Sequence, residues 1–225
     1  MTTPNLDSAD DGNLSGVLKA YLRAFIREHL DDMLPARIVS YDDATNRAVV
    51  QPLIMVGTTD GRKISRAQLP NIPVFRFGGG GFFMRFPIKA GDFGWLKAND
   101  RDVSLMFQRG GLEDWPNTER LHSFSDAMFF PDTIKDWAID GENADALVIQ
   151  SMDGSVCVAL HEGQITMKAP SMKVDIPETE WNGNFTGSGN MSFSGGTFTH
   201  NGKNVGGDHT HTGVQPGSGT SGEPA

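Results

Sequence analysis

The 225-residue sequence contains only one cysteine, Cys157, and no run of about 18 consecutive apolar residues. A single cysteine excludes a disulfide within the chain, which fits synthesis in a reducing cytoplasm. The first 13 residues are polar and acidic, whereas a secretion signal begins basic and continues apolar. We therefore expect a soluble chain that has neither a secretion signal nor a membrane span.

Positive charge is also scarce, since 19 Lys and Arg residues face 28 Asp and Glu residues and the net charge is -9. The net charge is -3 for residues 1–33, +2 for residues 34–131 and -8 for residues 132–225. Nucleic-acid-binding proteins usually carry a basic stripe, and an acidic distal part repels phosphates and anionic membrane surfaces. The distribution predicts no nucleic-acid partner and no electrostatic adhesion to a membrane.

The N-terminal residues 1–33 have the pattern of an amphipathic helix. Asn13 is a suitable N-cap, and Pro35 predicts that the helix ends near Met33. The apolar side chains of this helix lie along one stripe, which must pack on its own domain, on sister helices or on a partner protein. Its apolar residues recur at helical spacing and are Leu14, Val17, Leu18, Tyr21, Leu22, Phe25, Ile26 and Leu30.

Strand-like periodicity begins after this helix. About five short apolar runs separated by turn signals lie between residues 36 and 110, with no helix-length segment among them. This pattern predicts a small antiparallel barrel of the OB type. Residues 111–131 look like an irregular packed extension, and residues 132–144 look like a linker. The glycines of residues 78–81 lack the Lys-Ser/Thr of a phosphate-binding loop, so we expect a tight strand connection there.

The sequence pattern changes again in residues 145–200, where apolar residues alternate with polar ones in short stretches divided by Gly or Pro. One copy offers a single narrow apolar row and open strand edges, so it cannot close a core. Intertwining identical chains would bury that row and pair those edges. We therefore predict an intertwined β-helix stalk, and a flexible Gly-rich tail is the alternative.

A His-x-His pair, His209 and His211, precedes the C-terminal tail. In an extended strand both imidazoles face one side, but two ligands do not complete a metal shell. Three copies on a threefold axis would supply six imidazole nitrogens, which is an octahedral set. Two alternatives stay open: an exposed loop pair without metal, and a mononuclear metalloenzyme site that adds a carboxylate such as Asp208.

The sequence resembles the central spikes, or membrane-piercing needles, of contractile phage tails. That family includes a type with an N-terminal OB-fold and a trimeric β-helix. The match is strongest at the barrel and at the C-terminal end, in residues 36–42, 51–54, 69–74, 86–92, 122–127, 209–211, 213–219 and 222–224.

The resemblance implies a structural iron ion, one per homotrimer, bound octahedrally at the needle apex by the His209 and His211 side chains of three chains. Thr212 stands where relatives commonly have glycine. It also implies that the OB domain docks on the baseplate hub beside other tail proteins, and that the needle pierces the host outer membrane. The protein would be made in the host cytoplasm and lie in the virion, at the distal tip of the tail baseplate.

The predicted fold is therefore mainly β, and the predicted function is structural, not enzymatic. We expect no hydrolytic site at His122, Ser123, Ser125 and Asp126. A catalytic triad is defined by geometry, and clusters of these residue types occur by chance. The rival functions are an OB-fold module that binds nucleic acid or another ligand, and a mononuclear His-based metalloenzyme. The predicted parts are the helix (1–33), the barrel with its extension (34–131), the linker (132–144), the trimeric β-helix stalk (145–200) and the metal-binding apex (201–225).

Overall fold

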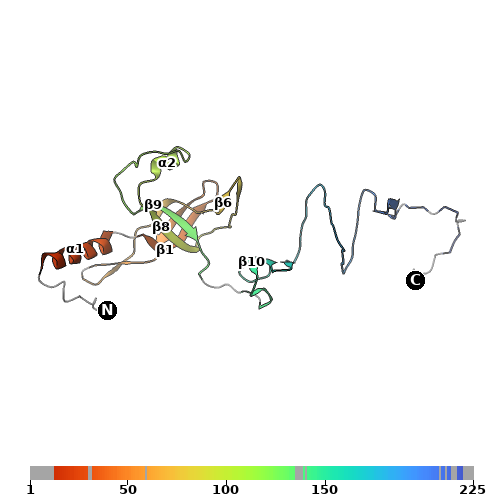
Figure 1. Ribbon diagram of the computed structural model, residues 1–225, viewed down its shortest axis with the longest axis horizontal. Helices are drawn as coiled ribbons and strands as arrows, with labels where there is room; N and C mark the ends of the chain where they lie inside the picture. Colours follow the sequence, from red (N-terminus) through yellow and green to blue (C-terminus); the bar gives the residue numbers. More distant parts are fainter. Residues whose placement is uncertain are drawn as a thin grey trace. The chain divides into compact units, whose positions relative to one another are not determined.

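The structure is a computed structural model that describes residues 13–29, 32–58, 60–134, 139, 141–207, 209–210, 212–213 and 217–219. The chain forms two compact units, Met1–Met172 and Lys173–Ala225. Both the barrel and the segments that follow it are β or irregular, and one long helix, α1, precedes them (Figure 1). No helix in the described ranges is long and apolar enough to cross a membrane.

Helix α1 spans Leu14–His29 and begins at the predicted cap. The Asn13 side-chain Oδ1 accepts a hydrogen bond from the backbone N–H of Gly16 at 2.8 Å, which satisfies one of the unpaired donors of the first turn. The predicted end near Met33 is wrong, because Met33 already begins strand β1. Pro35 disfavours helix in the residue before it, and Met33 pairs with Lys97 in the neighbouring strand.

The N-terminal half of the chain forms a nearly closed five-stranded barrel. Its strand order is β5-β2-β1-β8-β9, and neighbouring strands are antiparallel. A parallel bridge between Val74 and Phe129 connects the two outer strands, and the Phe75 N–H donates to the Phe129 carbonyl at 2.8 Å. This order is that of an OB-type Greek-key barrel, so the predicted fold class is confirmed. The strands are β1 (Met33–Asp42), β2 (Arg47–Pro52), β5 (Leu69–Pro73), β8 (Phe93–Asn99) and β9 (Ser123–Pro131).

The fifth strand lies where the sequence suggested an irregular extension. Strand β9 falls inside that segment, so four of the five barrel strands, and not all five, lie before residue 110. Its burial does not alternate cleanly, because Asp126 and Ala127 are both buried. Asp126 is buried since its carboxylate binds Arg120 at 3.1 Å, and this ion pair conceals the strand period in the sequence.

Two short hairpins and one short helix decorate the barrel. The hairpin of β6 (Gly78–Gly79) and β7 (Phe82–Phe83) turns at Gly80 and Gly81, which have φ angles of +59° and +86°. Two consecutive positive φ angles are typical of a type I′ turn, so the tight strand connection predicted for the glycines is confirmed. The other elements are β3 (Val56–Gly57), β4 (Lys63–Ile64), α2 (Ser104–Gln108) and a 3-10 turn at Gly141–Asn143.

The barrel core is built from alternate residues of its strands. These side chains face inward because successive residues of a strand point to opposite faces. Gly94 on β8 is needed for close packing, since a Cβ there would lie 2.2 Å from the Phe130 carbonyl oxygen and 2.5 Å from the Phe129 ring. The fully buried cluster is Ala36, Ile38, Ala48, Val50, Ile72, Val74, Leu96, Ala127 and Phe129.

A three-stranded antiparallel sheet follows the barrel, formed by β10 (Leu147–Gln150), β11 (Cys157–Leu160) and β12 (Ile165–Lys168). Directly paired residues of neighbouring strands share one face of a sheet. Leu147, Leu160 and Ile165 form one such row, and Ile149, Val158 and Met167 form the next. We call these six residues the aliphatic face. Leu147 and Ile149 are 68% and 65% exposed, so the described part of the chain leaves much of this face open.

The rest of the chain has little regular structure. Every residue from 169 to 198 is described, and none lies in a helix or strand. A small hairpin then pairs β13 (Thr199–His200) with β14 (Lys203–Asn204). A single chain does not test the intertwining of three chains, so the trimeric β-helix stays a prediction.

We expect the substitution Gly94→Ala to destabilise the barrel by about 1–3 kcal/mol, because the added methyl group must displace the β9 backbone or the Phe129 ring. Chemical denaturation of both proteins measures this difference. Gly57→Ala is the matched control, because a Cβ at Gly57 meets no atom within 4 Å and the glycine is not in the left-handed region. Equal stability of the two variants would contradict the packing described.

Candidate functional site

The predicted metal ligand His209 follows the β13–β14 hairpin. Its backbone N–H donates to the Gly206 carbonyl at 3.2 Å, and its ring Nδ1 lies 2.6 Å from the same oxygen. A carbonyl oxygen only accepts hydrogen bonds, so Nδ1 carries the proton and the ring lone pair is on Nε2. Metal-binding histidines commonly donate their second nitrogen to a carbonyl in this way. The ring of His209 is therefore in the tautomer that suits a metal ligand.

The other predicted ligand, His211, lies outside the described residues, as does Asp208. The structure consequently does not test whether the two imidazoles face one side. Within the described ranges no three His, Cys, Asp or Glu side chains come close enough together to hold a metal ion. The imidazole of His209 fits iron, nickel, cobalt or zinc as a donor, but a complete shell needs further ligands. The sequence analysis missed the supporting carbonyl of Gly206, because backbone acceptors have no signature in a sequence.

A second histidine has partners that the sequence did not suggest. The His161 Nε2 lies 3.3 Å from Asn143 Oδ1, and its Nδ1 lies 3.4 Å from an Asp145 oxygen. The Asn143 amide also points its Nδ2 at the buried Cys157 sulfur, 3.9 Å away. These contacts tie the 3-10 turn to the face of the small sheet opposite the aliphatic face. The arrangement explains the burial of the lone cysteine by packing.

The residues considered above for a hydrolytic site, His122, Ser123, Ser125 and Asp126, do not form a catalytic triad. His122 Nδ1 lies 3.7 Å from Asp100, whereas Asp126 is bound by Arg120. The Ser123 hydroxyl oxygen accepts a hydrogen bond from the Ser125 N–H at 3.3 Å. His122, Ser123 and Asp126 therefore do not line up as a base, a nucleophile and an orienting acid.

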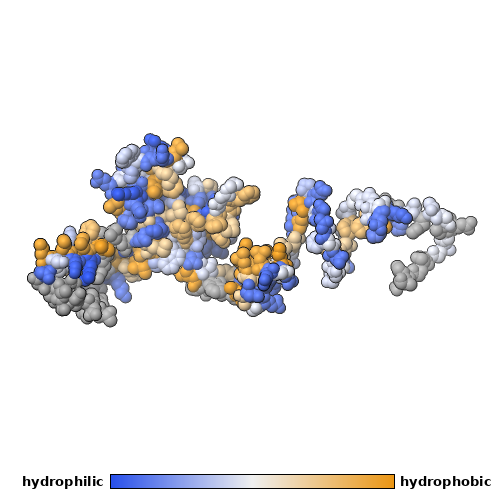
Figure 2. Space-filling view, viewed as in Figure 1, coloured by the Kyte–Doolittle hydropathy of each residue, from blue (hydrophilic) through white to orange (hydrophobic). Residues whose placement is uncertain are grey.

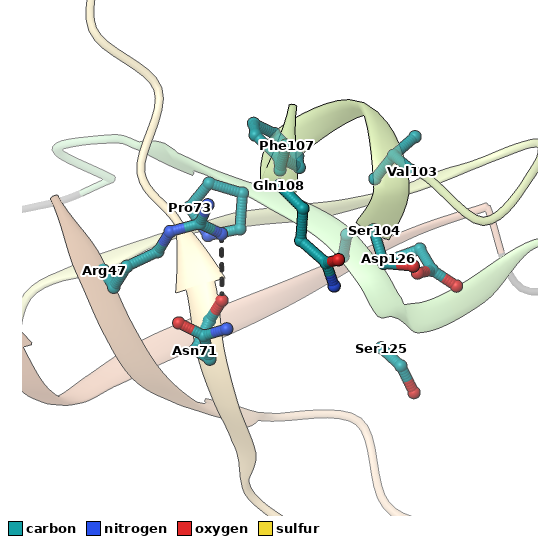
Figure 3. A pocket seen from close by; sticks show the side chains of 10 residues that line it. Arg47, Asn71, Pro73, Val103, Ser104, Phe107, Gln108, Ser125 and Asp126 are labelled. Atoms are coloured by element: carbon teal, nitrogen blue, oxygen red, sulfur yellow. Dashed lines mark hydrogen bonds between the residues drawn. The ribbon is translucent and has the colours of Figure 1, made fainter. Parts of the chain in front are cut away.

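The barrel carries a pocket of about 250 Å³ between α2 and strands β2, β5 and β9 (Figure 3). Arg47 crosses its mouth, with its guanidinium 4.7 Å from the centre of the Phe107 ring. The same guanidinium donates to the Asn71 carbonyl at 3.2 Å, drawn as the dashed line in Figure 3. The guanidinium beside this pocket thus already has two partners, one on α2 and one on β5.

Behind this pocket two buried carboxylates share one arginine. Arg120 donates to Asp126 at 3.1 Å and to Asp102 at 3.0 Å. Asp102 also accepts hydrogen bonds from the Ser104 N–H at 2.9 Å and from the Thr118 hydroxyl at 2.7 Å. The segment that enters α2 is therefore held to strand β9 through charged hydrogen bonds.

These neighbours lower the pKa of Asp102 well below its usual value, with Ser104 as the largest cause, followed by Thr118 and the charge of Arg120. The Ser104 hydroxyl itself is buried and makes no hydrogen bond of good geometry. We therefore attribute the effect of Ser104 chiefly to its backbone N–H, which does make one. Because the pKa is lowered, the ionised form of Asp102 stabilises the fold.

Another arginine cluster fastens the β6–β7 hairpin to the β1–β2 turn. Arg85 binds both carboxylate oxygens of Asp43, at 2.9 and 2.7 Å, and Arg76 reaches the same carboxylate at 3.1 Å. Arg76 also donates to the Tyr41 hydroxyl at 3.0 Å. The Arg85 side chain is the main cause that lowers the pKa of Asp43. The arginines of this cluster are thus already bound to protein oxygens.

Comparison with protein families gives one match at the barrel and one at the C-terminal end of the chain. Residues 34–132, which hold the barrel, match the phage protein Gp138 N-terminal domain. Residues 207–225, which include both histidines, match the GpV Apex motif. That motif is associated with a metal-binding tip and fits the end of a β-helix. Comparison with curated proteins finds no match.

A barrel of this type followed by an apex motif defines a structural protein of the phage tail. More narrowly, the two matches together are those of a phage central spike protein with an N-terminal domain of the Gp138 type. Proteins of this kind assemble with other tail proteins in the virion.

The Asp102 network predicts a pH-dependent stability. A carboxyl group with a lowered pKa contributes stability that is complete above its unfolded pKa of about 4 and is lost as the pH falls below that value. We expect Asp102→Asn to cost about 1–3 kcal/mol at pH 7, and the gap from the unsubstituted protein to narrow towards pH 3. Denaturant unfolding at pH 7, 5, 4 and 3 measures the gap.

Asp60→Asn is the control for this prediction, because Asp60 pairs with Arg62 on the exposed surface, where such pairs contribute about 0–1 kcal/mol. A stability gap for Asp102→Asn that stays constant down to pH 3 would show that its ionisation is not the cause.

Proposed function

We propose that this protein is the homotrimeric central spike of a contractile phage tail and that it pierces the host outer membrane when the tail contracts. Its tip is tied by one structural iron ion shared by His209 and His211 of three chains. The barrel docks on the baseplate hub, and the apex is the most distal point of the tail. The protein is made in the host cytoplasm and acts mechanically, without catalysis.

The aliphatic face is the observation that carries the proposed trimer. Its six side chains are apolar without exception and belong to a sheet that one chain leaves uncovered. Exposed apolar patches of this kind mark interaction surfaces. Three copies facing a common axis would cover one another with identical surfaces. The opposite face of the sheet needs no such cover, because it carries Cys157, Ala159 and their polar neighbours.

The segment after the sheet supports the same proposal. Met172, Val174 and Ile176 alternate with polar residues, and each is more than half exposed in the single chain. All residues from 169 to 198 are exposed, so this segment has no core of its own. Extended strands with open edges and an uncovered apolar row are completed by pairing with identical strands. The proposed intertwined stalk of residues 145–200 supplies those partners.

The proposed tip follows from the ring of His209. With Nδ1–H bound to the Gly206 carbonyl, Nε2 is the nitrogen that would face a metal. One chain offers two imidazoles in this segment, and six from three chains fill an octahedral shell without an open position. A filled shell supplies structural cross-linking and no catalysis, so the ion would hold three chain ends in one point.

The barrel gives little support to the rival nucleic-acid function. Several of its arginines are bound to carboxylates: Arg76 and Arg85 to Asp43, and Arg120 to Asp102. Arginines that already have carboxylate partners make poor phosphate ligands, and single-strand binding needs a basic groove beside exposed aromatics. The metalloenzyme alternative needs a carboxylate and an open position at the histidines, and it would place one metal in each chain.

We expect the double substitution His209→Ala and His211→Ala to give a trimer without metal, because the stalk holds the chains together independently of the tip. Size-exclusion chromatography with light scattering measures the mass, and elemental analysis of the same peak measures the metal. The substitution His200→Ala, in the hairpin before the apex, is the control and should leave the metal content unchanged. Retention of stoichiometric metal by the double variant would make the ligand assignment wrong.

The aliphatic face gives a separate prediction for the trimer. Ile149→Asp should shift the trimer towards monomer, because it places a charge in an apolar contact, whereas Gly163→Asp should not. Each change adds one negative charge, Ile149→Asp within the sheet and Gly163→Asp in its β11–β12 turn, where a Cβ meets no atom within 4 Å. Light scattering over a range of protein concentrations measures the shift. If the protein were a monomer, both positions would be exposed and both variants would behave alike.

A further inference from the structure

Helix α1 carries an apolar stripe that is largely exposed in the described part of the chain. Seven large apolar side chains form it, and each is at least 44% exposed. Figure 2 shows hydrophobic residues gathered along one side of this helix. The helix precedes residue 34, so it lies outside the matched Gp138 N-terminal domain. The stripe consists of Leu14, Val17, Leu18, Tyr21, Leu22, Phe25 and Ile26.

The spacing of the stripe is that of a helix that packs on other helices. Leu14, Leu18, Tyr21 and Phe25 are separated by four, three and four residues, which is the alternation of a coiled-coil seam. The residues that flank the seam are apolar as well, whereas two-stranded coiled coils usually carry charges there. A seam widened by apolar flanks buries more of its surface when it contacts two neighbouring helices than when it contacts one.

The length of α1 also requires a partner. Its 16 residues span about 24 Å, and isolated helices of this length are only marginally stable in water. Only residues 30–32 separate the helix from strand β1, and three residues reach at most about 10 Å. A trimer of barrels would therefore hold three copies of α1 at a high effective concentration.

We infer that the α1 helices of three chains associate in parallel through the seam of Leu14, Leu18, Tyr21 and Phe25. This bundle would clamp the spike at the end of the chain opposite the apex, and it rests on the proposed homotrimer. A membrane is the weaker candidate for the same stripe, because residues 1–33 carry a net charge of -3 and would be repelled by an anionic surface.

Disulfide cross-linking of the full chain tests the bundle. Leu18→Cys and Phe25→Cys each place a thiol in the seam, where thiols of neighbouring helices can approach to bonding distance. Arg23→Cys places it on the opposite side of the helix. The unsubstituted protein controls for Cys157, which is buried. After mild oxidation, non-reducing electrophoresis separates single chains from linked pairs, and light scattering of the same samples gives the number of chains.

The inference predicts a trimer in which both seam variants form linked pairs at least ten times faster than Arg23→Cys. A trimer in which all three variants link equally slowly would overturn the bundle and leave the proposed function intact. A monomeric protein would overturn the trimer, and the bundle with it. Co-sedimentation of the unsubstituted protein with phosphatidylcholine and phosphatidylglycerol vesicles, abolished by Leu18→Glu with Phe25→Glu, would assign the stripe to a membrane and overturn the bundle.

Discussion

Burial of apolar surface is the constraint on which the rest of this molecule depends, and among the described residues the barrel meets it most completely. The barrel closes on itself, because β5 and β9 join through Val74 and Phe129 and enclose a core of small and branched side chains. Beyond the barrel the aliphatic face and the residues from 169 to 198 are exposed. The chain is thus a barrel with its own core followed by a segment with exposed apolar residues, which agrees with the proposed spike built from several copies.

Charged residues have different roles in the barrel and in the distal part of the chain. In the barrel, arginine side chains form ion pairs that hold loops and hairpins in place. Asp43 binds arginines beside the β6–β7 hairpin, and Asp102 binds an arginine beside α2. These contacts make a rigid platform suited to docking on other tail proteins. The distal part has a surplus of acids and few basic residues, so it gains nothing from phosphates or from anionic lipid. Such a non-adhesive shaft suits the proposed mechanical passage through a membrane.

The sequence predicted the helix cap, the barrel and the glycine turn, because each depends on local chemistry or on a short-range apolar period. It misplaced the fifth strand, since the buried Asp126 breaks the alternation of β9 and only the distant Arg120 explains that burial. It gave no indication of the partners of His161, because Asn143 and Asp145 approach that side chain only through the fold. The metal ligands were predicted from spacing and family resemblance alone. The carbonyl that orients His209 became visible only in the structure.

The central claim is that three chains share one metal at the apex, and native mass spectrometry of untagged protein tests it most directly. The account predicts a single species with the mass of three chains plus one ion, and elemental analysis identifies that ion as iron. One metal on each single chain would contradict the shared tip and favour an open metalloenzyme site. A metal-free monomer would contradict both the tip and the trimer, and would leave a barrel with an extended tail.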